Sequence, residues 1–483
     1  MRKAGKKALA LGLALAMALS LCVMSAGAET STTCDGNNCQ HAAKIGGTHY
    51  DTLQDAVTVA TNGDTIELLK DVTEASAPVT FEKSTDDVIT LNLGEHTYTY
   101  SYNNSSGTAF LITGGKLIIE NGKIITTGAN ASNNGAISVE GDCTAGQENP
   151  VYATAVIKND VVIESSSYAA VGVFGNVAQA DIYGTAKGLY YGVAGNGTKN
   201  STEYNGGTII NIYDGAEIGH TDTSDGVAVF QSQKGTLNIS GGEMTGLVGV
   251  QVCAGTVNIS GGTIRATGKN TLTDYSYASS GNVLDGAALS IINRSGGYAG
   301  EVNITITGGT FTSVQGDAVL EYTSNAAASK IESIAIKGGT FTSASGSNAV
   351  NVQLKGSNTA VPVITGGTFS SSPLEYAATG YCVKDNGGTY AVVLASGLTS
   401  GTYYSKAELT SANLASGYYI SSSEENEGIR TTVVAQTVIL PPDTNPGTSG
   451  GTTGGTTGGT TTGTTTETVK NEDGSTVTTV TDP

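Results

Sequence analysis

The chain has 483 residues, and its composition already narrows the fold class. It contains 67 glycines, no tryptophan and only 13% charged residues, which suits neither a helical bundle nor a disordered chain. The net charge of −19 provides no cationic surface for nucleic acid or for an anionic membrane. The composition instead favours many short strands joined by tight turns.

The first 28 residues have the pattern of a secretory signal peptide. Four basic residues lie between positions 2 and 7, an apolar run covers residues 8–24, and Ala26-Gly27-Ala28 provides a cleavage site. We expect cleavage after Ala28 rather than a membrane anchor, because the apolar run is short and no basic stop signal follows it. Cleavage removes four positive and no negative charges, so the net charge changes from −19 to −23. The sequence therefore predicts a protein that is secreted or held at the cell surface, with no membrane insertion after cleavage.

Residues 29–43 form a short N-terminal extension with two closely spaced cysteines. Cys34 and Cys39 can pair in an oxidising compartment, and we predict a disulfide between them. A zinc site that adds His41 and His49 is the alternative, but the Cys-x4-Cys-x-His spacing matches no standard zinc module. We therefore predict no metal site and no cofactor.

A capping unit precedes the repeats. Thr52-Leu53-Gln54-Asp55 has the pattern of a capping box, and an apolar stripe at helical spacing follows it. Asn62-Gly63 ends the predicted helix, and Ile66 and Leu68 alternate with polar residues in the first strand. The end of a solenoid is an open sheet edge, so this short helix is predicted to cover the first coil.

A repeated glycine pair is the strongest pattern in the chain. The pair occurs at Gly241-Gly242, Gly261-Gly262, Gly308-Gly309, Gly338-Gly339 and Gly366-Gly367. Isoleucine stands two residues before every pair, and an apolar residue stands three residues after its first glycine. Apolar and polar positions alternate as in a strand with one buried face, and glycine permits the positive φ of a sharp corner. Because the same residues recur in the same columns, we predict that the isoleucines stack on one another inside a coil.

A second strand pattern lies between the glycine corners. It occurs at residues 135–139, 226–229, 286–289, 317–320 and 348–352, with weaker copies at 108–112 and 169–174. The last three copies begin 31 residues apart, which is about one turn of a three-sided β-solenoid. We predict an all-β fold, a right-handed parallel β-helix of roughly 10–13 coils, and a rod about 50–60 Å long at ~4.8 Å per coil.

Two further parts are predicted at the C-terminal end. We assign residues 44–395 to the β-helix and residues 396–440 to a small β cap over its last coil. Strands predicted at residues 390–394 and 431–440 suggest this cap. Residues 441–483 form a tail in which the stretch 450–466 consists only of glycine and threonine, as in a flexible linker. A hairpin-like turn follows at residues 471–474.

An insertion interrupts the repeats in the middle of the chain. The glycine corners at 261 and 308 are 47 positions apart, where one coil needs about 30. The surplus is residues 271–284, which contain Asp274, Tyr275 and Tyr277. Loops that leave a rigid scaffold often bind ligands, and tyrosine stacks on sugar rings or anchors protein contacts. We predict these three residues as a binding surface; a loop without a specific ligand is the alternative.

Two segments of the N-terminal cap carry a family resemblance. The stretches KIGGTHYDTLQDA at 44–56 and NGDTIELL at 62–69 resemble the N-terminal cap of pectate-lyase-like β-helix proteins. With the Ile-x-Gly-Gly-Thr-Phe corners, the resemblance covers about residues 44–395 and is closest to adhesin-like secreted or surface proteins of gut Firmicutes-type bacteria. It implies the fold but no single activity, because the family includes polysaccharide lyases, hydrolases and surface proteins without demonstrated chemistry.

The basic residues do not form the site that a lyase of this fold needs. Such an enzyme uses clustered carboxylates to hold Ca²⁺ and an arginine or lysine as base. Arg265 has one acid near it in the aligned copies, Glu243, and is expected to point to solvent. Arg294 lies at a strand end and Arg430 in the terminal unit.

The acids do not match a hydrolase of this fold either. Hydrolysis would need several acids clustered on one strand face together with a Gly-His-Gly motif. The Asp86-Asp87 pair lies in a polar loop near the N-terminal cap, and His220 is followed by threonine rather than glycine.

We therefore predict a non-catalytic, secreted or cell-surface β-helix protein, a monomer that acts as an adhesin-like or structural interaction module. Its expected partner is a glycan or a host or bacterial surface protein, and no nucleic acid. The alternative is a polysaccharide lyase or glycoside hydrolase that acts on host or plant glycans. A long groove in which three or more carboxylates converge would favour the enzyme.

Overall fold

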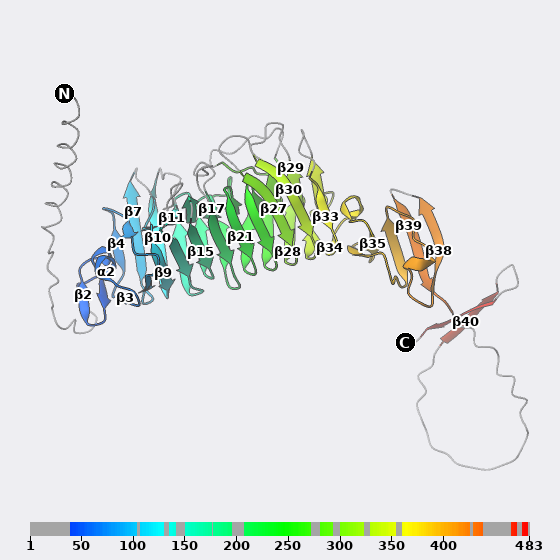
Figure 1. The fold of residues 1–483 in the computed structure, drawn as a ribbon, viewed down its shortest axis with the longest axis horizontal. Coiled ribbons are helices and arrows are strands. Elements are labelled where there is room, and N and C mark those ends of the chain that lie inside the picture. Colours follow the sequence, from blue (N-terminus) through cyan, green and yellow to red (C-terminus); the bar gives the residue numbers. More distant parts are fainter. Residues whose placement is uncertain are drawn as a thin grey trace, which may run out of the picture.

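The computed structural model shows an elongated stack of short strands, with one α-helix among its described residues, near the N-terminal end of the stack (Figure 1). It describes residues 39–103, 107–129, 135–141, 150–175, 177–195, 207–271, 281–292, 300–322, 329–353, 360–425, 428–437, 465–470 and 476–481. No helix in these ranges is long and apolar enough to cross a membrane.

Three sheets, named A, B and C here, run along the stack, and the chain visits them in turn. Sheet A contains the parallel strands β3 (Thr65–Leu68), β6 (Val88–Asn92), β9 (Gly115–Glu120), β12 (Ala153–Ile157), β15 (Ala178–Ile182), β18 (Thr208–Ile212), β21 (Gly235–Ile239), β24 (Gly255–Ile259), β27 (Gly300–Ile306), β30 (Ser329–Ile336) and β33 (Pro362–Ile364). Two antiparallel strands, β1 (Ala43–Ile45) and β2 (Thr48–Tyr50), close its N-terminal edge.

Sheets B and C are built in the same way. Sheet B contains the parallel strands β4 (Val72–Glu74), β7 (Thr97–Asn103), β10 (Gly122–Ala129), β13 (Val161–Ser165), β16 (Thr185–Gly188), β19 (Glu217–His220), β22 (Glu243–Gly246), β25 (Thr263–Lys269), β28 (Thr310–Gln315), β31 (Thr340–Thr342) and β34 (Thr368–Phe369). Sheet C contains β5 (Val79–Phe81), β8 (Phe110–Ile112), β11 (Gly135–Gly141), β14 (Ala169–Gly175), β17 (Tyr191–Ala194), β20 (Val227–Gln231), β23 (Val248–Val252), β26 (Leu289–Ile292), β29 (Val319–Tyr322) and β32 (Val350–Gln353).

The predicted parallel β-helix is confirmed. Sheet C has ten strands, so the described chain completes ten coils, and β33 and β34 begin another. Each strand pairs in parallel with the strand of the same sheet in the next coil, as β21 does with β24 and β24 with β27. The number of coils agrees with the predicted range.

The predicted isoleucine column is also confirmed. The five isoleucines stack in register from coil to coil, and each is at most 1% exposed: Ile239, Ile259, Ile306, Ile336 and Ile364. The column continues toward the N-terminus through Ile212, Ile182, Ile157, Ile119, Leu91 and Ile66. These earlier members were not predicted, because no glycine pair follows them in the sequence.

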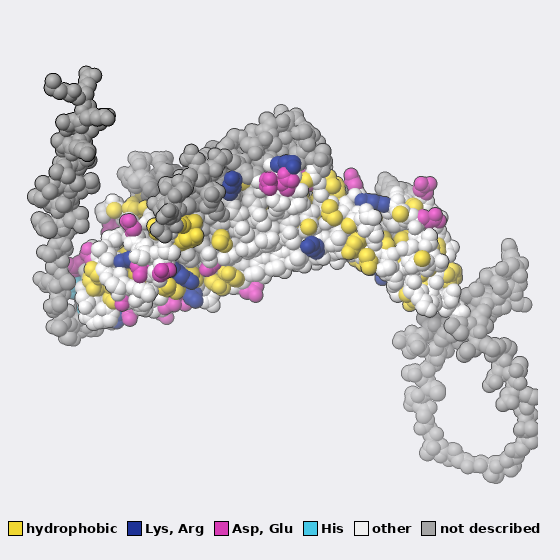
Figure 2. All heavy atoms as spheres, in the orientation of Figure 1, with side chains coloured by type: hydrophobic (Ala, Val, Ile, Leu, Met, Phe, Trp, Pro, Cys, Tyr) yellow, Lys and Arg dark blue, Asp and Glu magenta, His cyan; other side chains and the backbone are white. Residues whose placement is uncertain are grey.

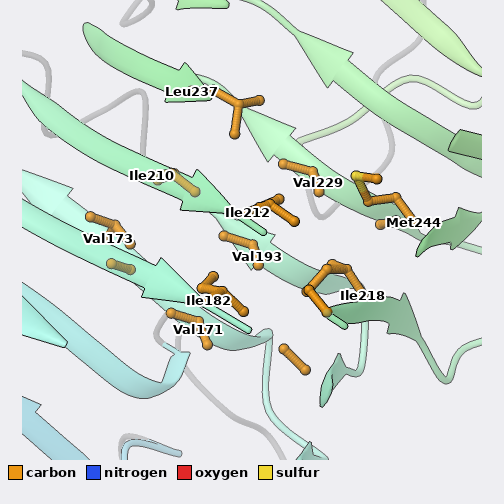
Figure 3. Close-up of a cluster of buried hydrophobic side chains, with 14 of the residues drawn as sticks. Val171, Val173, Ile182, Val193, Ile210, Ile212, Ile218, Val229, Leu237 and Met244 are labelled. Atoms are coloured by element: carbon orange, nitrogen blue, oxygen red, sulfur yellow. The ribbon is translucent and has the colours of Figure 1, made fainter. Parts of the chain in front are cut away.

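Aliphatic and aromatic columns from the other sheets fill the rest of the interior. In the middle coils, valines of sheet C face the isoleucines of sheets A and B (Figure 3). Near the C-terminal end, Phe311, Phe341 and Phe369 stack with ring centroids 4.7 and 4.8 Å apart and nearly parallel planes. Each fully buried side chain of this size contributes about 1.5–3 kcal/mol, so the columns are the main source of stability.

The two glycines of a corner have different roles. A Cβ on Gly308 would lie 2.3 Å from the carbonyl oxygen of Ser260 in the preceding coil, so the first glycine permits close approach of the coils. Gly309 has a φ of +93°, which side chains rarely tolerate, so the second glycine makes the corner. The prediction from sequence accounted for the second requirement but not for the first.

The N-terminal cap has the predicted helix, α2 (Leu53–Val59). The Thr52 hydroxyl accepts a hydrogen bond from the Asp55 N–H at 3.1 Å, and the helix buries Leu53, Ala56 and Val57. Gln54 binds both backbone groups of Thr80 in β5, accepting from its N–H at 2.7 Å and donating to its carbonyl at 3.1 Å. The helix therefore covers the first coil and satisfies the open edge of sheet C.

The C-terminal cap continues sheet B with antiparallel strands. It contains β35 (Tyr381–Asp385), β36 (Tyr390–Leu394), β37 (Gly401–Ser405), β38 (Tyr418–Glu425) and β39 (Ile429–Ala435), with 3₁₀ turns η3 (Leu374–Tyr376) and η4 (Ser411–Asn413). β36 pairs with the last solenoid strand, β34, and coincides with the predicted strand. β39 corresponds to the second predicted strand as far as Ala435; residues 438–440 lie outside the described ranges.

A separate hairpin lies in the tail. β40 (Thr465–Lys470) pairs antiparallel with β41 (Thr476–Thr481) on either side of the predicted turn.

Substitution of the first glycine of a corner tests the close approach of the coils. Gly308→Ala should lower the free energy of unfolding by about 1–3 kcal/mol in urea titrations, because its new Cβ overlaps the Ser260 carbonyl. Gly47→Ala, in the β1–β2 turn, is the control, since a Cβ there meets nothing within 4 Å. Equal stability of the two variants would contradict this role.

Candidate functional site

The predicted binding residues Asp274, Tyr275 and Tyr277 lie outside the described residues. The two ends of the same insertion are described. The carbonyl oxygen of Leu284 accepts hydrogen bonds from the Thr271 hydroxyl at 3.2 Å and from its N–H at 3.4 Å, which closes the base of the insertion.

The returning limb of the insertion, residues 281–285, is attached to sheet C. The Gln251 side chain accepts from the N–H of Val283 at 2.9 Å and donates to its carbonyl at 2.8 Å. Val283 is fully buried and packs with Ile292 and Tyr322. Asn282 accepts from the Tyr191 hydroxyl at 3.1 Å. These contacts fix the path of the limb over strands of several coils.

Two buried aspartates support this attachment. Asp285 is 1% exposed and accepts from the Ser290 hydroxyl at 2.5 Å and the Ala287 N–H at 3.0 Å. Burial raises the pKa of Asp285 to about 7, and the negative charge of Asp317 adds to the shift. Asp317 accepts from the Asn348 N–H and the Asn351 amide, both at 2.7 Å. Both carboxyl groups are used inside the scaffold rather than presented to a ligand.

Gln251→Ala should release the returning limb, because it leaves both backbone groups of Val283 without this partner. We expect faster amide hydrogen exchange at residues 281–285 and a loss of stability of about 2 kcal/mol. Gln179→Ala is the matched control, since within the described chain the Gln179 side chain bonds to the Asp181 carboxylate and to no backbone group. Unchanged exchange at Val283 would show that the amide does not hold the limb.

Glu321 is the least expected buried group. It occupies an inner column of sheet C between Ile291 and Val352 and is 0% exposed, and neither carboxyl oxygen has a hydrogen-bond partner among the described residues. Burial raises the pKa of Glu321 from 4.5 to about 8. The alternation of apolar and polar residues predicts an apolar side chain at this inner position, so the sequence did not indicate a buried glutamate there.

Glu321→Gln tests the protonation of this carboxyl. Because the pKa is higher in the folded state, wild-type stability should fall as the pH rises from about 4.5 to about 8. The variant should match the wild type at pH 4 and exceed it by about 5 kcal/mol at pH 9 in chemical denaturation. Glu425→Gln, at an exposed position, should show no such gain. An equal difference at both pH values would contradict a buried, neutral Glu321.

An open groove follows the corner between sheets A and B. It has a volume of about 560 Å³ and is lined by corner glycines of four successive coils, Gly215, Gly242, Gly262 and Gly309. Side chains are absent from these positions, so the coil backbone itself borders the groove. At ~4.8 Å per coil, the lined part extends roughly 15–20 Å along the solenoid.

The first residues of four sheet B strands border this corner groove. Glu217, Glu243, Thr263 and Thr310 pair in register from one coil to the next. All four are exposed, and Asp214 lies beside Glu217 at the N-terminal end. Next to Asp214, the half-buried Tyr213 stacks on Tyr183 with ring centroids 4.3 Å apart. The groove thus combines corner backbone that repeats once per coil with carboxylates in its first two coils and hydroxyls in the next two.

A larger concavity of about 650 Å³ lies beside the N-terminal cap, where Gln54, Lys70 and Tyr98 contribute to its lining. It is formed where the cap helix meets β4. The corner groove is the more distinctive surface because its chemistry repeats. On the face seen in Figure 2, the middle coils carry few charged or hydrophobic side chains.

Two of the three arginines considered as catalytic residues are described, and they lie in different parts of the molecule. Arg265 is exposed and its strand neighbours in register are Thr245 and Thr312. Arg430 lies 3.7 Å from Glu424 in the C-terminal cap, and Arg294 lies outside the described residues.

His220 has a structural role. Its Nε2 accepts a hydrogen bond from the Leu247 N–H at 2.9 Å, so the proton lies on Nδ1, which is 2.7 Å from the Asp222 carbonyl oxygen. Burial lowers the pKa of His220, which favours the neutral ring. The Asp87 carboxylate accepts from the Ser84 N–H within its own loop.

The N-terminal cysteine and histidines are in separate contacts. Cys39 is disulfide-bonded, but the predicted partner Cys34 lies outside the described residues, so this pairing stays a prediction. His41 lies 2.7 Å from the Asp51 carboxylate and stacks on His49. Within the described ranges, no three histidine, cysteine or acidic side chains are grouped to hold a metal ion.

Comparison with known proteins adds no relative: no family model, curated protein or solved structure matches the chain.

Proposed function

We propose that the chain is an exported, non-catalytic β-helix protein, adhesin-like in role, that binds carbohydrate along the corner groove. The observation that carries this proposal is the groove itself, which is open, polar and repeated over four coils. The signal-peptide pattern and the resemblance of the cap to adhesin-like members of the pectate-lyase-like group support the same proposal.

The groups beside the groove suit sugar hydroxyls. The carboxylates of Asp214, Glu217 and Glu243 accept hydrogen bonds, and the hydroxyls of Thr263 and Thr310 both donate and accept them. Glycine at the corner allows a ligand to approach the backbone closely. An open groove of this kind accommodates a chain that enters and leaves at its ends.

The arrangement of the acids favours binding over hydrolysis. A glycoside hydrolase places two carboxyl groups on either side of the bond that is cleaved. Glu217 and Glu243 instead stack in a single column at the head of β19 and β22, and Lys187 lies 3.5 Å from Glu217. With Asp214 beside Glu217, three carboxylates line the groove, the number that also favours the enzyme alternative. We propose binding because Glu217 and Glu243 stack in one column, and not on either side of a ligand.

A pair of tryptophans in the groove tests this proposal. Thr263→Trp/Thr310→Trp should reduce binding to immobilised glycans by tenfold or more, because the indoles fill a space that glycine leaves open. The control is Thr245→Trp/Thr342→Trp, at exposed positions farther along the same sheet. A glycan array with the wild-type chain first identifies the bound glycans. Equal binding by both double variants would place the binding surface elsewhere, and no glycan binding by the wild type would overturn the proposal.

A further inference from the structure

We infer that the ligand of the corner groove is an extended, β-linked polymer of amino sugars that lies parallel to the solenoid axis, with one sugar residue per coil. This inference rests on the proposed function, which it makes specific in ligand class and direction.

The spacing of the coils carries the argument about direction. Equivalent groups in successive coils are about 4.8 Å apart, because the coils are neighbouring strands of one sheet. This distance is close to the rise per residue of an extended β-1,4-linked polysaccharide, whose successive rings present alternate faces. An extended peptide advances only about 3.3–3.4 Å per residue and would fall out of step after one or two coils. A periodic groove therefore matches a periodic glycan better than a peptide.

The register of the coils makes the match possible over the whole groove. Glu217 pairs with Glu243, Glu243 with Thr263, and Thr263 with Thr310, without a shift in register at these positions. Each coil thus presents one oxygen-bearing side chain and one corner glycine at the same place. Four coils provide four subsites, with a glutamate in each of the first two and a threonine in each of the last two.

The charge at one end of the groove carries the argument about chemistry. Asp214, Glu217 and Glu243 lie within two successive coils. Lys187 is the basic group near them, 3.5 Å from Glu217, and Glu243 makes no ion pair within the described chain. The ammonium group of an amino sugar in the adjacent subsite would supply the missing positive charge. A neutral sugar could form only hydrogen bonds with these carboxylates, without an ion pair.

The test uses β-1,4-linked glucosamine oligomers of two to six residues, with their N-acetylated counterparts, titrated against the full chain. We expect affinity to rise with each residue up to four and then level off, because the groove is lined over four coils. The free amines should bind more tightly than the acetylated oligomers, and added salt should reduce the difference.

Glu217→Gln/Glu243→Gln should lower the affinity for the free amines about fivefold, to that of the acetylated oligomers. The control, Glu408→Gln/Glu425→Gln, removes the same charge from exposed positions of the C-terminal cap and should bind as the wild type does.

Three outcomes overturn the inference. They are affinity that stops rising at the disaccharide, equal binding of free and acetylated oligomers, and no effect of the glutamate variant. The proposed function stands in these cases if a glycan still binds in the groove. It falls only if the array finds no glycan, or if the tryptophan pair leaves binding unchanged.

Discussion

Each coil of this solenoid lies so close to the next that a carbonyl oxygen of one corner occupies the space where a side chain of the following corner would begin. Hypothetical Cβ atoms on Gly261, Gly308, Gly338 and Gly366 would lie only 2.2–2.4 Å from such oxygens. The parallel strand pairs hold successive coils in one register at this close approach. Because the register is fixed, every side chain falls above its equivalent in the coil before, and the interior becomes a set of continuous apolar columns.

The same register orders the outer surface. On sheet A, the amides of Asn211, Asn238 and Asn258 form a ladder of hydrogen bonds that ends on Asp181, with distances of 2.7–2.9 Å. At the corner between sheets A and B, it aligns the glycines and polar side chains of the groove. The groove therefore follows from the packing of the fold, and its spacing is that of the coils.

The insertion shows a different use of the scaffold. Its returning limb is attached through Gln251 to the backbone of Val283, and the buried Asp285 is bonded to Ser290 a few residues later. The carboxyl group of Asp285 thus has a structural role, because it holds this segment of the chain in place. The same holds for His220, whose two ring nitrogens both meet backbone groups.

The sequence predicted those features that repeat. Five glycine pairs with isoleucine two residues before them were sufficient for the fold class, the stacking and the order of the coils. The earlier coils lack the pair at this corner, and Gly215 stands alone after Asp214. The repeat of glycine pairs therefore did not reveal half of the isoleucine column or one end of the groove. The groove itself was not predicted, because a surface lined by glycine has no residue pattern beyond that of the corner. Glu321 and the partners of Gln251 depend on contacts between coils, which local alternation does not encode.

A crystal structure of the chain with a β-1,4-linked glucosamine hexamer would test the central claim most directly. We expect the sugar chain to lie along the corner past Gly215, Gly242, Gly262 and Gly309, with successive rings in step with successive coils. A hexamer that crosses the coils, or that binds on another face of the molecule, would contradict the account.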